Sequence, residues 1–540
     1  MKFIHSMAGA LMMAAVFVAP CLGEGEAPGT ASARELVIGM GRYDVELNPY
    51  KSIYAHEMQI FTALYEGLFS YDPQSIDPIR AQAQSFEKSK DGKTWTFHLR
   101  QDARWSDGTP VTANDFVESW LYLLAPETKA EYAVFFDIVK GAKAFRTGKN
   151  RKPASVGISA SDERTLVVEL DAPAAYFTRL LCHSAFVPVH RSLRGVRTWK
   201  PESVIGNGPY TLVSMDKDSM VMAKSGSYWD ERNVAVPAIR VHFIESEAEA
   251  TSRFNDGEID WLTDMADLDT LAATDAIQFA PMFATGYYFW NSSRKPWNDA
   301  RVRRALALLV PWEQIRTEDK YYAPTSVLVL PFAGYESPAG IVKPDEAEAL
   351  RLLAEAGHAE GKGLPPVRFV YYESETHDAN LDVIEAAWNS VGVKVERVIV
   401  PDGATIRDIR QEGYSLSFTS WIGDFADPAA FLLMWTSDSG LNEGAYKSRG
   451  YDALVARSMT EEGAARLATL AEAEGKLLAD AALLPLYHSI SFNVIDTAAI
   501  TGWYQNPLDI HPFKAMGFGA PKARPYVVLA SGAVPEGGVR

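Results

Sequence analysis

Hydrophobic and polar residues alternate along this chain with two different periods, which predicts a mixed α/β protein. Alternation every second residue predicts strands, whereas apolar residues three and four positions apart predict helices. Met58 to Phe69 keeps its apolar residues on one helical face. Phe86 to Arg100 alternates around an Asp91-Gly92 turn, which is typical of a β-hairpin. Trp95, Phe97 and Leu99 point to one side of that hairpin.

The same patterns predict further elements along the whole chain. Strands are expected at Glu35–Met40, Arg164–Leu170, Tyr210–Ser214, Met220–Ala223, Ile239–Ile244, Tyr287–Trp290, Val367–Tyr372, Val393–Val400, Tyr414–Phe418 and Leu484–His488. Helices are expected after a Thr112 cap, and at Ala248–Asn255, Asp299–Leu309, Ala347–Ala356, His377–Val391, Ile406–Glu412 and Arg466–Leu483. The Asp299–Leu309 helix is predicted to carry a basic face of Arg301, Arg303 and Arg304.

Length and charge narrow the class of protein. A chain of 540 residues with 47% hydrophobic residues is globular and suggests about two to four domains. Its formal charge of 52 − 69 = −17 argues against a nucleic-acid or anionic-membrane partner.

The N-terminus has the layout of an export signal. An apolar run from Met7 to Ala19 follows Lys2 and is too short to span a bilayer. We therefore predict a signal peptide over residues 1–21, a flexible leader over 22–34, and export to the periplasm. Cys21 resembles a lipoprotein cysteine, but Pro20 departs from the usual small residue, so lipidation and ordinary cleavage stay open. Cys182 is then left without a disulfide partner, and we expect it to be a buried small hydrophobe.

The sequence has no motif that predicts catalysis, a cofactor or a metal. We find no phosphate loop, no His-Glu-x-x-His, no paired cysteines and no Gly-x-Ser-x-Gly elbow. The ten histidines are too scattered to indicate a metal site. We therefore expect no cofactor and no enzyme activity, and a secreted hydrolase is the least favoured alternative.

One stretch, Phe418 to Pro428, has the chemistry of a ligand site. Trp421 offers a flat apolar wall, and Gly423 lets backbone approach closely. Asp424 lies between Gly423 and Phe425, where a partly desolvated carboxylate favours a cationic partner. The alternative is that Asp424 caps a turn or the helix after Pro428. The residues of this stretch leave both interpretations open.

Several segments, taken together, resemble the peptide-binding components of bacterial ABC importers, the extracellular solute-binding family 5. The likeness runs in order from about Leu36 to Gly519, and among family members it is strongest to the oligopeptide-binding proteins. It rests on Leu64–Asp72, Asp91–Arg100, Ala103–Phe116, Asn207–Tyr210, Tyr228–Asp230, Gly257–Asp260, Trp297–Ala305, Trp421–Pro428 and Tyr446–Ser448.

The resemblance implies a class II periplasmic-binding-protein-like fold, with two α/β lobes and an extra lobe around a ligand cleft. By this analogy, lobe I comprises residues 35–66, 192–283 and 490–519. The extra lobe comprises residues 67–191, lobe II residues 284–489, and a tail residues 520–540. The implied function is to capture an oligopeptide and deliver it, as a monomer, to a membrane permease and its ATPase. Alternative ligands of the same fold are a murein peptide, a dipeptide, haem or a metal chelate.

The resemblance also assigns roles to individual residues. Asp424 matches the aspartate that pairs with the peptide's α-ammonium, which favours the ligand-binding interpretation over a turn cap. His377 and Arg410 match positions where relatives place partners for the peptide carboxylate; the alternatives are a residue near a helix N-cap and a solvated arginine. The remaining expected ligand contacts are Trp421, Gly423, Tyr132, Asn442, Tyr287 and the backbone of the loop from Lys51 to Ala55. For Trp421 and Tyr132 the alternative is packing in the core.

The chain also departs from the relatives. Ile422 and, approximately, Ala284 stand where well-known oligopeptide binders have cysteines, and Ser489 replaces a tyrosine. A tryptophan expected shortly before Arg410 is missing. We therefore expect different side-chain pockets. The whole interpretation fails if Asp424 lies in solvent or is already neutralised by a neighbouring side chain.

Overall fold

The computed structural model describes residues 34–519, apart from residues 53, 175, 264, 318–321, 332, 402–403 and 426. Its largest feature is a mixed sheet of eleven strands in this part of the chain. Ten strands follow one another across the sheet, and the eleventh, β13 (Tyr322–Pro324), pairs with β17. In order they are β15 (Val395–Ile399), β14 (Val367–Tyr371), β16 (Leu416–Ile422), β12 (Ile277–Trp290), β17 (Leu483–Ile495), β11 (Trp261–Thr263), β1 (Leu36–Gly41), β10 (Ala238–Ile244), β9 (Ser219–Lys224) and β8 (Tyr210–Met215).

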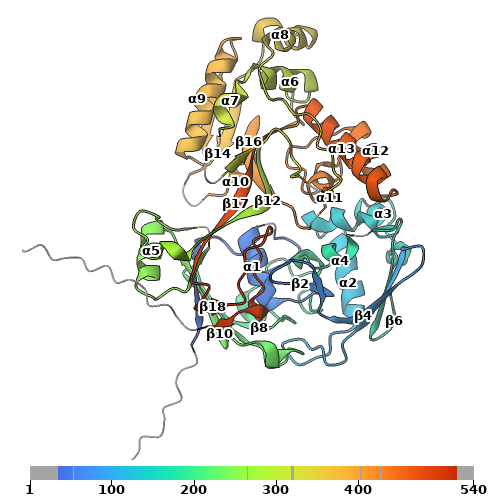
Figure 1. The fold of residues 1–540 in the computed structure, drawn as a ribbon. Coiled ribbons are helices and arrows are strands. Elements are labelled where there is room, and N and C mark those ends of the chain that lie inside the picture. Colours follow the sequence, from blue (N-terminus) through green and yellow to red (C-terminus); the bar gives the residue numbers. More distant parts are fainter. Residues whose placement is uncertain are drawn as a thin grey trace, which may run out of the picture. The chain divides into compact units, whose positions relative to one another are not determined.

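Two long antiparallel strands, β12 and β17, lie in the middle of this sheet (Figure 1). Both are longer than the short strands that the sequence predicts. Register shifts between Pro281 and Thr285 and at Gly286 interrupt the alternation, which explains why the pattern revealed only one end of each strand. The predicted lobe boundaries at 283/284 and 489/490 fall within these continuous strands, so the division into lobes stays a prediction.

A second sheet contains the predicted hairpin. Its order is β4 (Ala83–Lys88), β5 (Thr94–Leu99), β7 (Thr165–Glu169) and β6 (Ile158–Asp162). Trp95, Phe97 and Leu99 are all buried, as their alternation predicts. Helix α2 (Ala113–Leu124) contacts β6 and β7 and begins with a capping box between Thr112 and Asp115. Two small pairs complete the sheets: β2 (Phe69–Tyr71) with β3 (Pro78–Arg80), and β18 (Ile500–Thr501) with β19 (Gly517–Phe518).

The predicted helices are present with shifts of a few residues at their ends. Figure 1 shows α6 (Ala300–Leu309), α8 (Glu346–Glu355) and α9 (Glu375–Asn389) around β14 and β16. The remaining α-helices in the described part are α1 (Ala55–Leu64), α3 (Ala142–Arg146), α4 (Phe177–Leu180), α5 (Glu247–Asn255), α7 (Trp312–Ile315), α10 (Ile406–Gln411), α11 (Ala429–Leu432), α12 (Arg449–Ser458) and α13 (Gly463–Ala479).

Helix α1 differs from its prediction because it ends at Leu64 instead of Phe69. The Leu64 carbonyl accepts a hydrogen bond from Gly208, 3.1 Å away, in a loop distant in sequence. A Cβ atom on Gly208 would lie 2.4 Å from the Ala63 carbonyl oxygen, so the approach requires glycine. Tyr65 turns to an extended conformation at this contact. A tertiary contact therefore ends a helix whose apolar pattern continues.

The predicted basic face of α6 is wrong for Arg303. This side chain is buried and donates hydrogen bonds to the carbonyl oxygens of Trp297, at 2.7 Å, and Asp480, at 2.8 Å. Arg301 remains exposed and pairs with Asp299. Helical periodicity alone cannot distinguish a solvated arginine from one that satisfies buried carbonyls.

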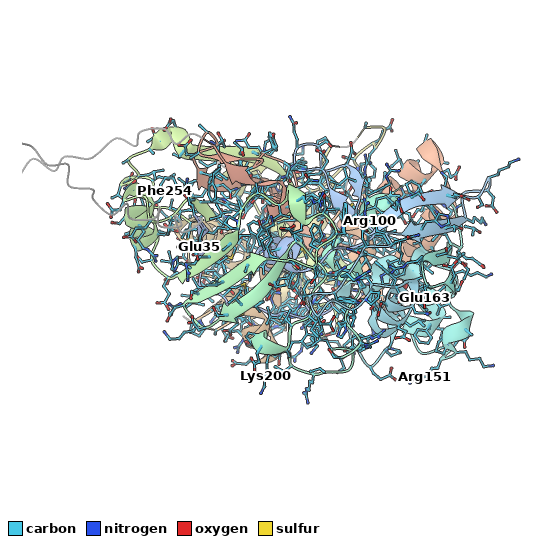
Figure 2. The ribbon with its side chains drawn as sticks, turned by 90° about the horizontal axis from the view of Figure 1, so that it is seen from below. Glu35, Arg100, Arg151, Glu163, Lys200 and Phe254 are labelled. Atoms are coloured by element: carbon cyan, nitrogen blue, oxygen red, sulfur yellow. The ribbon has the colours of Figure 1, made fainter. Side chains whose placement is uncertain are left out.

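The surface of the described part carries many paired charges. Glu35, labelled in Figure 2, lies just before the first strand and pairs with Arg240 at 2.8 Å. Arg151 lies at the outside in the same view and contacts Glu127. Within the described residues, no helix has the length and apolar character needed to cross a bilayer.

Candidate functional site

Strand β16 positions the stretch that the sequence singles out. It pairs along its whole length with β12, and β14 covers its other edge only at Leu416 and Ser417. After the strand, the Gly423 N–H donates to the Phe283 carbonyl at 2.7 Å. A Cβ atom on Gly423 would lie 2.5 Å from the Phe283 ring, so the predicted need for glycine has a steric basis here. This turn leads the chain from the strand into Asp424.

Asp424 is buried, with 6% of its surface exposed. Its Oδ1 lies 3.0 Å from Nε2 of His183, although the two groups are not aligned as a hydrogen bond. The Nδ1 atom of His183 accepts a hydrogen bond from the Ala185 N–H at 3.1 Å. A nitrogen that accepts carries no proton, so this ring is the neutral Nε2–H tautomer. Asp424 therefore has a polar neighbour that does not neutralise its charge.

Two tyrosines complete the surroundings of Asp424. The Tyr132 ring lies 4.5 Å from His183 and 6.2 Å from Trp421. Burial raises the pKa of Tyr132, and the negative charge of Asp424 raises it further. Burial also raises the pKa of Tyr71, with smaller contributions from Cys182 and then Asp424. We call Asp424, His183, Tyr132 and Tyr71 the carboxylate cluster.

Three polar atoms of the carboxylate cluster lack hydrogen-bond partners. Asp424 Oδ2, the Tyr71 hydroxyl and Nε2 of His183 are buried and form no hydrogen bond within the described part of the chain. Leaving such atoms unpaired costs about 1–3 kcal/mol each, and more for a charged group. The cluster is therefore suited to a ligand that brings a positively charged hydrogen-bond donor. No sequence pattern points to His183, and Tyr71 is recognisable only as part of the Leu64–Asp72 segment.

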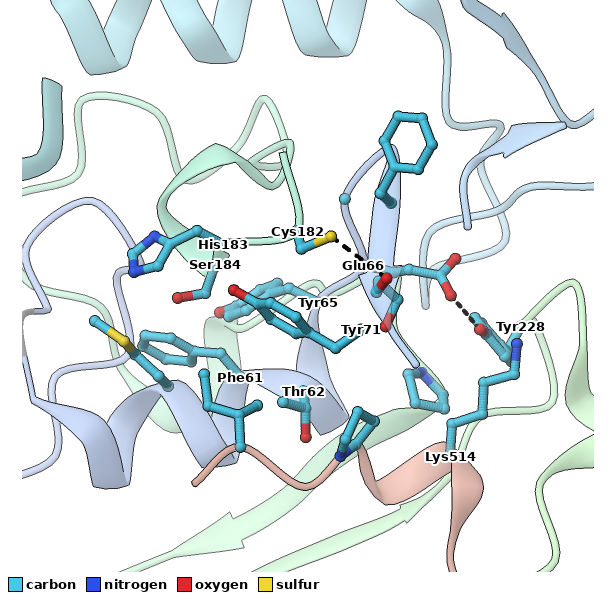
Figure 3. A pocket seen from close by; sticks show the side chains of 17 residues that line it. Phe61, Thr62, Tyr65, Glu66, Tyr71, Cys182, His183, Ser184, Tyr228 and Lys514 are labelled. Carbon is cyan, nitrogen blue, oxygen red and sulfur yellow. Dashed lines mark hydrogen bonds between the residues drawn. The ribbon is translucent and has the colours of Figure 1, made fainter. Parts of the chain in front are cut away.

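A small cavity of about 40 Å³ lies next to this cluster (Figure 3). His183 and Ser184 line one side, and Glu66, Tyr228 and Lys514 line the other. Burial raises the pKa of Glu66, whose carboxylate accepts hydrogen bonds from Tyr228, Trp229 and Gln82. A space of this size holds a few water molecules and no peptide side chain. Cys182 also lines it, buried and free as predicted.

Arg410 is buried and bonded within the protein. Its Nε donates to Ser417 Oγ at 2.9 Å, one terminal nitrogen donates to the Phe418 carbonyl at 2.6 Å, and the other contacts Glu443. Arg407 adds a bidentate pair with Glu131, at 2.8 and 2.9 Å, and reaches Glu443 at 3.2 Å. We call these two arginines and two glutamates the arginine cluster. Its charges balance, so Arg410 offers little unpaired charge to a peptide carboxylate.

His377 lies in the first turn of α9 against aromatic rings. Its ring is 4.4 Å from Phe418, and Nδ1 is buried without a hydrogen-bond partner among the described residues. Burial lowers the pKa of His377. At neutral pH it is therefore a neutral side chain that can donate or accept a hydrogen bond but supplies no positive charge.

The other predicted contacts lie in different surroundings. Tyr287 lines a larger cavity together with Trp421 and Tyr54, the residue before Ala55 at the start of α1. Asn442 instead builds a turn: its side chain accepts from the Tyr446 N–H at 3.0 Å and donates to the Tyr446 carbonyl at 2.7 Å. Its amide is therefore already used within the chain.

The two positions that lack family cysteines face each other. Ala284 on β12 and Ile422 on β16 are directly opposite in the strand register. Both are apolar, and Ala284 is fully buried. Two apolar side chains therefore pack together at the position where the relatives have cysteines.

Comparisons with known proteins agree with this fold and with the predicted resemblance. Residues 77–443 match the middle region of the bacterial extracellular solute-binding proteins, family 5. The chain is 31% identical over 508 residues to the periplasmic oligopeptide-binding protein OppA of Escherichia coli, covering 89% of this chain and 91% of that protein.

Two solved structures share the fold over 90% of this chain and 99% of their own. The Escherichia coli murein tripeptide binding protein MppA has a TM-score of 0.80 at 28% identity. Haemophilus influenzae OppA, in complex with the peptide RPPGFSPFR, has a TM-score of 0.80 at 25% identity. These similarities confirm the predicted fold class, and the relatives are binding proteins instead of enzymes. The chain belongs to the bacterial extracellular solute-binding proteins, family 5.

Proposed function

We propose that this protein captures oligopeptides in the cleft beside β16 and that Asp424 binds their α-ammonium group. The observation that carries the proposal is the buried Asp424 Oδ2, which is negatively charged and has no hydrogen-bond partner in the described part of the chain. An ammonium group has three N–H donors, and Asp424 Oδ2 and the Tyr71 hydroxyl are both able to accept. Similarity to oligopeptide-binding and murein tripeptide binding proteins supports the same ligand class.

The sheet supports capture of the peptide main chain. Strand β14 leaves the edge of β16 from Phe418 to Ile422 without a strand partner among the described residues. An extended peptide can add to such an edge through backbone hydrogen bonds, which do not depend on side-chain identity. Trp421 lies on this segment and provides an apolar surface beside it.

The wider role follows from the family. We propose that the protein works as an exported monomer in the periplasm, with two lobes and an extra lobe, and passes its ligand to an ABC permease and ATPase. The signal peptide and the possible lipidation of Cys21 fall outside the described residues and stay predictions.

Free and N-acetylated peptides of one sequence test the assignment. Acetylation removes the positive charge, and a buried charge that loses its partner costs about 3–5 kcal/mol. We therefore expect the free peptide to bind at least about a hundredfold more tightly, and Asp424→Asn to lose this advantage. Calorimetry measures both affinities.

Asp218→Asn is a matched control because Asp218 lies on the surface in a pair with Arg42. It removes the same charge and leaves peptide affinity unchanged. Equal affinity for free and acetylated peptides would overturn the proposal. It would instead favour a ligand without a free amine, such as haem or a metal chelate.

A further inference from the structure

A second cavity of about 100 Å³ lies next to the carboxylate cluster. One face of the paired strands β12 and β16 forms its floor, with Tyr287 directly opposite Thr419 in the register. Trp421 connects the cavity to the carboxylate cluster because its ring also contacts Tyr132. A peptide held by Asp424 therefore has this cavity within reach of one of its first side chains. The inference below rests on the proposed function and adds a ligand class to it.

Five of the twelve residues that line the cavity are aromatic. The Trp435 ring lies 5.8 Å from Tyr287 and 6.3 Å from Phe289, and both contacts are tilted or edge-on. Met434 and Leu441 are buried beside them. Rings in such arrangements present apolar surface and edge hydrogens to a guest ring.

The charged residues at the cavity are already paired with one another. Glu131 and Arg407 form a bidentate pair, and Glu443 contacts Arg407 and Arg410. Two positive and two negative side chains therefore compensate each other. A lysine, arginine, aspartate or glutamate of a ligand would have to break one of these pairs and lose its own hydration. A neutral apolar side chain has no such cost.

We infer that this cavity receives a large apolar or aromatic side chain of the bound peptide and that the protein selects peptides carrying one near the amino end. Full burial of such a side chain favours binding by about tenfold to a hundredfold over alanine. The arginine cluster acts as the element that excludes charged side chains.

A peptide series tests the inference. In a tetra-alanine host with a free amine, each position is changed in turn to Phe, Leu, Lys or Glu, and the affinities are measured by calorimetry. We expect one position at which Phe and Leu bind about tenfold or more tightly than Ala, whereas Lys and Glu gain nothing. A gain from Lys or Glu equal to that from Phe, or no preference at any position, overturns the inference.

Thr419→Phe fills the cavity from its floor. It should reduce the preference for Phe over Ala in the peptide to less than about threefold. Val213→Phe is the matched control because it adds the same ring on β8, at a side chain that is 63% exposed. It should keep the full preference. If Thr419→Phe does not fold, the peptide series with the unchanged protein decides alone.

N-acetylated versions of the series separate this inference from the proposed function. If acetylation weakens binding but no side chain is preferred, only the inference fails. If acetylation has no effect, the proposed function fails.

Discussion

The carboxylate cluster and the arginine cluster both contain buried charge, but only the first leaves a charge unpaired. Asp424 has a neutral histidine beside it and one oxygen without a partner within the described residues. Arg410 has partners on all three of its guanidinium nitrogens. The difference teaches that residue type does not decide which charge serves a ligand. What decides it is whether the fold has already supplied a counter-charge.

The same contrast occurs within a single loop. Asp427 follows Asp424 by three positions and forms two 2.8 Å contacts with Arg466. Both carboxylates are buried to a similar degree. Asp427 therefore serves the fold, whereas Asp424 remains available.

Arg466→Met is expected to have the largest effect on the free energy of unfolding. It leaves Asp427 buried without a counter-charge, which should lower the free energy of unfolding by about 3 kcal/mol. Urea denaturation measures it. Arg151→Met is the matched control because Arg151 forms an exposed pair with Glu127 and should cost less than about 1 kcal/mol. Equal stability of both variants would show that Asp427 does not need Arg466.

Arg410→Ala tests the contribution of the arginine cluster to stability. We expect a loss of about 2 kcal/mol in the free energy of unfolding, because Glu443, Ser417 and the Phe418 carbonyl lose a shared donor. Amidating the peptide's carboxyl end should change affinity equally in both proteins. If the effect of amidation disappears in Arg410→Ala, the sequence-based role of Arg410 as a carboxylate partner is correct.

Lowering the pH is expected to have a smaller effect on the free energy of unfolding. Burial lowers the pKa of His56 and of His488 from 6.5 to about 4. Unfolded histidine therefore binds a proton at a higher pH than the folded form. The stabilisation is complete above pH 6.5 and is lost as pH decreases towards 4, with a loss of about 1.4 kcal/mol for each histidine already at pH 5.5.

Denaturation between pH 7 and 4 measures this slope. His488→Gln should make this slope shallower. An unchanged slope in His488→Gln would mean that this ring binds a proton as readily in the folded protein as in the unfolded chain.

Sequence patterns alone predicted the α/β class, most of the longer helices and strands and the family, because these depend on local periodicity and on motifs in a fixed order. They missed α12 (Arg449–Ser458) and short strands such as β11 (Trp261–Thr263). The sequence also singled out Asp424, since Gly423 and Trp421 flank it in the chain. These signals come from residues that are close together in the sequence, within one helix, strand or turn.

The pairing of the buried charges becomes visible only in the folded chain. His183 reaches Asp424 from 241 positions earlier in the chain, and Glu131 reaches Arg407 across 276 positions. The sequence also could not show that Arg303 is buried or that a glycine loop ends α1. Each of these depends on a partner distant in sequence, and the free energy of a buried charge depends on that partner more than on its own neighbours in the chain.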